Sequence, residues 1–135
     1  MNAVLGTIDY GASSVISAIH PPVIKTMKAK TDNGTLAAGL VVAKDSIGDL
    51  VAYEPLGDAP LNAAVGVLVQ DCDTSTDDAA LVLRHGTVVL GKLKVGIGAP
   101  ASSDLDALEA LGIFAIDGAL NVNAPPASEI PSLVP

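Results

Sequence analysis

The side chains best suited to chemistry in this sequence are one cysteine, Cys72, and two histidines, His20 and His85. A cysteine acts as a nucleophile through its thiolate, which nearby positive charge favours and nearby carboxylates disfavour. Cys72 lies among aspartates, His20 precedes two prolines, and His85 precedes a glycine at an expected strand end or turn. No serine has the Gly-x-Ser-x-Gly spacing of a hydrolase elbow. We therefore expect no catalytic residues and no enzyme activity.

A second group of reactive type is a run of carboxylates that could hold a cation. The run comprises Asp71, Asp73, Asp77 and Asp78. A calcium loop of the EF-hand type starting at Asp71 would need glycine and glutamate where the chain has Thr76 and Val82. A solvated acidic turn fits better than the alternative of a weak cation site. We expect no metal.

The segment 96–101, Gly-Ile-Gly-Ala-Pro-Ala, matches a loose Gly-x-Gly-x-x-Ala pattern between an expected strand and an expected helix. Dinucleotide binding needs this pattern inside a parallel β-α-β unit. Pro100 interrupts the approach to the helix, and we expect no second parallel strand after it. The sequence therefore predicts a glycine-rich connection and no cofactor.

The elements that would position these residues are short apolar runs, separated by glycines and acidic turns every eight to twelve residues. The runs cover residues 36–43, 50–53, 63–69, 79–84 and 88–93. A further strand is expected over 24–30, with a tight turn at Asn33-Gly34 that forms a hairpin into Leu36. This rhythm predicts a mainly β protein, a small β-sandwich or barrel-like domain.

One short helix is predicted at about 103–111. Ser103 could cap it, Asp104 and Asp106 suit its first turn, and Gly112 suits its end. Its apolar stripe consists of Leu105, Leu108 and Leu111. After it, residues 113–116 and 119–122 flank Asp117-Gly118, which predicts a second hairpin.

The chain divides into three parts. Residues 1–22 end in two prolines and are expected to form an extended N-terminal arm. The alternative is an edge strand packed on its own domain. Residues 23–123 form the β-rich domain, and residues 124–135 form a proline-rich tail that should be extended.

Composition points toward association with other proteins. The chain has 135 residues, the size of one domain, and 50% of them are hydrophobic although only 2% are aromatic. Such a surplus of aliphatic side chains predicts that part of the surface is covered by a partner. Self-association is the simplest explanation.

Charge excludes some partners. The formal net charge is −8, which disfavours nucleic acid because phosphates would be repelled. Among the few basic residues, Lys25, Lys28 and Lys30 lie together, either as a solvated strand face or as a docking patch for an acidic partner. No apolar run is long enough to span a bilayer, so no membrane is expected. The start of the chain does not resemble a signal peptide, and a single cysteine fits a reducing cytoplasm.

Four segments of the chain carry a resemblance to a known family. They are Gly-Thr-Leu-Ala-Ala-Gly-Leu-Val-Val-Ala-Lys at 34–44, Leu-Val-Ala-Tyr at 50–53, Ala-Ala-Val-Gly-Val-Leu-Val at 63–69 and Leu-Val-Leu-Arg-His-Gly-Thr-Val at 81–88. In this order they resemble the head decoration proteins of lambda-type tailed phages, over roughly residues 30–116. The scarcity of aromatics and the proline-rich tail depart from that pattern.

The resemblance implies homotrimers on the outer surface of an expanded icosahedral head, at three-fold and quasi-three-fold sites. There they would stabilise the shell against the pressure of packaged DNA, after synthesis in the bacterial host cytoplasm. The partner would be the major capsid protein, and the arm would add backbone pairing to its exposed edge. The apolar arm residues expected to contact the capsid are Val4, Leu5, Ile8, Tyr10, Val15, Ile16 and Ile19.

Two other kinds of protein remain open. One is another phage structural component, such as a tail or head-completion protein that uses the same β module. The other is a small β-barrel that binds a ligand or acts as an enzyme, which no residue specifically supports.

Overall fold

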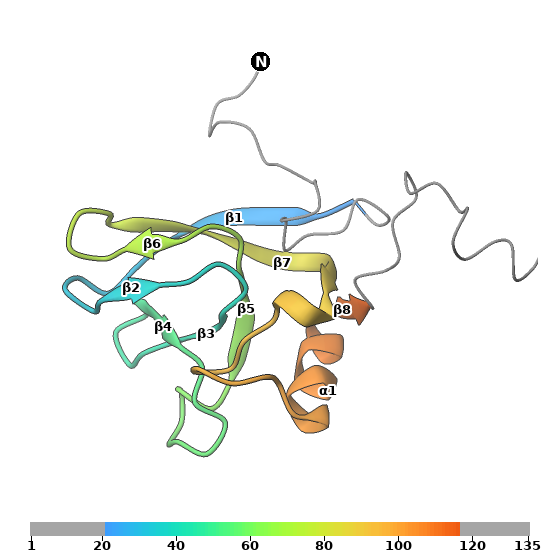
Figure 1. Ribbon diagram of the computed structural model, residues 1–135. Coiled ribbons are helices and arrows are strands. Elements are labelled where there is room, and N and C mark those ends of the chain that lie inside the picture. The colour runs from blue at the N-terminus through green and yellow to red at the C-terminus, as the bar shows by residue number, and fades with distance from the viewer. Residues whose placement is uncertain (1–20, 117–135) are drawn as a thin grey trace, which may run out of the picture.

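The computed structural model describes residues 21–116, which form a mainly β domain with one α-helix (Figure 1). The elements in chain order are β1 Val23–Lys28, β2 Thr35–Leu36, β3 Val41–Lys44, β4 Leu50–Ala52, β5 Ala64–Leu68, β6 Cys72–Asp73, β7 Ala79–Val89, the 3-10 helix η1 Leu90–Lys92, α1 Ser102–Leu111 and β8 Ile113–Ile116. The predicted fold class is confirmed. The arm residues 1–20 and the stretch 117–135, which holds the tail, lie outside the described residues.

The main sheet curls until its two end strands meet. Its antiparallel strands follow the order β1-β7-β5-β3-β4, and β7 is the longest of them. A bridge between Ala29 and Leu50 joins the β1 end to β4, and the Lys30 N–H donates to the Leu50 carbonyl at 3.1 Å. The barrel is therefore closed at one end of β1. β2 and β6 form a separate two-stranded sheet.

β3 and β5 are covered on both faces, which explains why their sequences are almost continuously apolar rather than alternating, whereas most residues of β1 are exposed. Val41 and Ala43 of β3 pack in one cluster with Leu108 of α1, whereas Val42 packs in the other cluster with Leu50 and the β2–β6 region. Aliphatic side chains of modest size can therefore fill two small cores that large aromatics would overfill.

Three of the expected strand boundaries are wrong. The run 36–43 is split between β2 and β3 because Gly39, with φ +92°, turns the chain. The run 79–84 lies in β7, which continues through Gly86, with φ +138°, to Val89. The expected strand 88–93 is therefore only the end of β7, and its residues 90–92 form η1. Cys72 and Asp73 form β6 where a turn alone was expected.

The hairpin expected through Asn33-Gly34 does not form, because β1 pairs with β7 and β2 pairs with β6. The loop instead rests on the buried Thr74. The Thr74 hydroxyl donates to the Gly34 carbonyl at 2.7 Å and accepts from the Asn33 N–H at 2.6 Å. A long-range contact thus determines this turn.

The helix lies where it was expected, but its cap differs. Ala101 is the N-cap residue, and the Asp104 carboxylate accepts from the Ala101 N–H at 2.8 Å, so Ser103 is not the cap. Gly112 ends the helix in the left-handed conformation, with φ +89°, as predicted.

The strand after the helix corrects another expectation. β8 runs parallel to β7, with Gly86 opposite Ile113 and Val89 opposite Ile116. A parallel strand therefore does follow α1. The second strand of the expected hairpin, 119–122, lies outside the described residues.

Candidate functional site

Cys72 is a packing residue in this fold. It is 2% exposed, lies in the cluster that also contains Leu36 and Met27, and its thiol contacts the Ala79 carbonyl at 3.8 Å. Burial raises the pKa of the Cys72 thiol, and the charges of Asp77 and Asp73 raise it further. The thiol is therefore kept protonated, as the acidic sequence context predicted.

The structure does not bring this thiol to the described histidine. Cys72 contacts Ala79 at the start of β7, whereas His85 lies six residues further along the strand, about 20 Å away at ~3.3 Å per residue. The His85 ring instead packs against Gly112 at the end of α1. The two residues form no catalytic pair.

The acidic run builds its own turn. Asp73 accepts from the Ser75 N–H at 3.1 Å and from the Ser75 hydroxyl at 2.7 Å, and these hydrogen bonds lower the pKa of Asp73. Asp77 accepts from the Asp73 N–H at 3.2 Å, and Asp71 accepts from the Ala38 N–H at 2.8 Å. Within residues 21–116, no three acidic, cysteine or histidine side chains are grouped so that they could hold a metal ion.

The glycine-rich segment forms a tight turn rather than a phosphate cradle. Val95 and Gly98 exchange backbone hydrogen bonds of 2.9 and 3.1 Å, which leaves Ile97 at the tip. At the start of α1, the Asp104 carboxylate already accepts from the first backbone N–H. A phosphate there would meet a negative charge, so the parallel β7-α1-β8 arrangement does not make this segment a dinucleotide site.

Sequence reasoning missed a buried polar pair between the end of β4 and α1. The hydroxyl of the buried Tyr53 donates to the carboxylate of the buried Asp104. Burial raises the pKa of Tyr53, and the charge and hydrogen bond of Asp104 raise it further. This pair is structural, since Asp104 also caps the helix. The only signal in the sequence was an isolated tyrosine at a strand end.

Beside Tyr53, two neighbouring turns form a shallow apolar hollow of about 470 Å³. Its lining consists of Tyr53, Glu54, Pro55, Leu56, Gly57, Val95 and Gly96. The tips of the two turns carry Leu56 and Ile97, which are fully exposed at 100% and 105%. Removing large aliphatic side chains from water is favourable, so Leu56 and Ile97 form the leading candidate for a surface that another protein covers.

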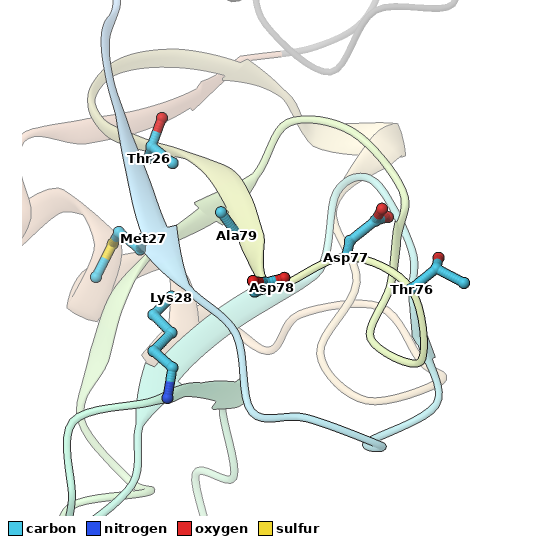
Figure 2. A pocket seen from close by; sticks show the side chains of 7 residues that line it. All are labelled: Thr26, Met27, Lys28, Thr76, Asp77, Asp78 and Ala79. Carbon is cyan, nitrogen blue, oxygen red and sulfur yellow. The ribbon is translucent and has the colours of Figure 1, made fainter.

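A second hollow, of about 660 Å³, lies between the end of β1 and the acidic turn (Figure 2). It is lined by Thr26, Met27, Lys28, Thr76, Asp77, Asp78 and Ala79. In Figure 2, Lys28 extends away from Asp77 and Asp78. Its ammonium group lies 3.4 Å from the Asp49 carboxylate, and its side chain remains 66% exposed. The hollow is open, and its lining is a mixture of polar and apolar side chains.

The arm residues predicted to contact a capsid, Val4 to Ile19, lie outside the described residues, so the structure brings none of them to a site. None of the helices within residues 21–116 is both long and apolar enough to cross a membrane. In comparisons with protein-family models and with curated proteins, the sequence matches neither a family model nor a curated relative.

Proposed function

We propose that this protein is a capsid decoration protein, which binds as a homotrimer to the outside of an expanded tailed-phage head and stabilises the shell. The sequence resemblance over residues 30–116 supports this proposal. The observation that carries it is the fully exposed pair Leu56 and Ile97 on adjacent turns. The reactive side chains described above serve the fold, so the surface is the part of this domain left for function.

The arrangement of the chain ends supports attachment from one side. Pro22 lies against Gly86, and Gly86 also pairs with Ile113 of β8. Residues 1–20 and 117–135 therefore join the domain at the same end of β7. In the proposed complex this end faces the shell, where the arm adds backbone pairing to the major capsid protein.

Three copies joined in one body would strengthen weak individual contacts. Each copy contributes one arm, and arms that can bind together raise the overall affinity well beyond that of one arm. The net charge of −8 per chain keeps such an assembly soluble and away from nucleic acid.

The proposal is tested by mixing the purified protein with empty expanded heads and with compact precursor heads of the encoding phage. Electron microscopy should show knobs at three-fold positions on expanded heads only, and light scattering should show a trimer. Rings or tubes of the protein alone would indicate a tail or head-completion component instead. A monomer that ignores both shells would refute decoration.

The role of the arm has its own test. Deleting residues 2–20 should leave the thermal unfolding of the domain unchanged, because residues 21–116 contain both cores. The same deletion should abolish binding to expanded heads. Undiminished binding by the truncated protein would disprove the arm contact.

A further inference from the structure

β1 has an open edge along most of its length. One edge of β1 pairs with β7 from Val23 to Lys28, and the other edge meets β4 only beyond the strand, at the Ala29–Leu50 bridge. β4 itself is only three residues long. Among the described residues, no strand therefore covers the outer edge of β1, which lies at the border of the sheet in Figure 1.

The backbone groups at this edge are identified by alternation. The Ala29 N–H bonds to Asp78 beside β7, whereas the Lys30 N–H bonds to Leu50 on the other side. Successive N–H groups of a strand point to opposite edges, so the N–H groups of Thr26 and Lys28 point to the open edge. These groups are positioned to pair with an added extended segment.

The same edge carries a local excess of positive charge. Lys25, Lys28 and Lys30 are all exposed and are three of the seven basic residues in a chain of net charge −8. The β7 residues that pair with Lys25 to Lys28 of β1, from Ala79 to Val82, are uncharged. The facing carboxylates gather at one end only, with Asp49 near Lys28 and Asp77 and Asp78 beside the second hollow.

From these observations we infer that the open β1 edge makes a second contact with the shell. This inference rests on the proposed function. It receives an extended segment of the capsid subunit that carries carboxylates and adds as a strand beside β1. The lysines cover five residue steps, about 17 Å at ~3.3 Å per step, so the segment needs carboxylates spread over that length. β1 also follows directly from the arm, which brings this edge to the shell side.

The test compares two charge-reversal variants with equal net charge. Lys25→Glu/Lys28→Glu/Lys30→Glu alters the β1 edge, and Lys44→Glu/Lys92→Glu/Lys94→Glu is the matched control elsewhere. At low salt the β1 variant should bind expanded heads at least about tenfold more weakly than the control variant, because charges at an interface act locally. Replacing the three β1 lysines with arginine should retain binding. If the triple variant fails to fold, Lys25→Glu is compared with Lys44→Glu.

Hydrogen–deuterium exchange tests the backbone part of the inference. A proteolytic fragment covering residues 23–30 should exchange more slowly on expanded heads than in the free protein, with the gain at Thr26 and Lys28. Equal binding by the two reversal variants, or unchanged exchange at these amides, would overturn the inference. The proposed function would survive either result, since it fails only if the unaltered protein does not decorate expanded heads.

Discussion

At the scale of single residues, Gly66 shows how closely β5 and β7 approach each other. A Cβ atom at this position in β5 would lie 2.5 Å from both the Leu83 carbonyl oxygen and a methyl group of Val82. Neither the backbone nor the buried valine can move aside without disturbing β7. The requirement for glycine here is steric, because its φ is not in the left-handed region.

We expect Gly66→Ala to lower the free energy of unfolding by about 2–4 kcal/mol, the range for overpacking combined with a backbone shift. Gly91→Ala is the matched control, because a Cβ there would have no atom within 4 Å. Urea titration of both variants measures the difference. Equal stability of the two variants would show that β5 and β7 are further apart than the structure indicates.

The second prediction concerns Tyr53 and the dependence of stability on pH. Its pKa is raised above the ordinary 10.0, so the folded state holds the phenol proton more tightly than the unfolded chain does. The corresponding stability is complete below pH 10 and is lost as the pH rises through the folded-state pKa. Tyr53→Phe should cost about 1–2 kcal/mol at neutral pH and should flatten the decline above pH 10. Thermal unfolding of both proteins between pH 7 and 11 measures the two effects, and parallel declines would contradict the assignment.

At the scale of elements, the joint between α1 and β8 depends on Gly112. This residue has φ +89°, and an added Cβ would collide with the ring of His85. The joint matters because it sets the parallel pairing of β8 with β7.

Gly112→Ala should therefore destabilise the domain by about 1–3 kcal/mol, from the left-handed backbone and from the displaced imidazole. In a His85→Ala background the collision disappears, and only the backbone cost of about 1 kcal/mol should remain. A double-mutant cycle measured by denaturant unfolding separates the two contributions. If the effects of the two substitutions on the free energy of unfolding are simply additive, the ring does not pack on Gly112.

The elements also show which features local sequence can reveal. Gly112 and the leucine stripe located α1, and the runs 50–53 and 63–69 located β4 and β5, because these signals act within a few residues. Which strands pair with each other was harder to predict from the sequence. The partner of β2 is β6, and the Asn33-Gly34 loop is held by Thr74, forty residues away, so no local pattern could distinguish this arrangement from a hairpin. The Tyr53–Asp104 pair escaped notice for the same reason.

At the scale of the whole molecule, the exposed pair Leu56 and Ile97 makes the proposed trimer testable. Neither side chain supports the core, so changing them should not alter the stability of one copy. Leu56→Asp/Ile97→Asp should weaken trimer formation by about tenfold or more, since a buried apolar contact would be replaced by charge. Ile47→Asp, at a residue that is 79% exposed on another turn, is the control. Light scattering over a concentration series measures association, and equal behaviour of both variants would exclude this surface as the contact between copies.

Pro22 and β8 both lie beside Gly86, and this has a practical consequence for engineering. A short linker could join residues 21 and 116, and the chain could be reopened at the Asp45–Asp49 turn to give a circular permutant of the same barrel. Passengers fused at residues 21 and 116 would emerge together on one side. A permutant would carry them on another side, so one scaffold could present cargo in two orientations.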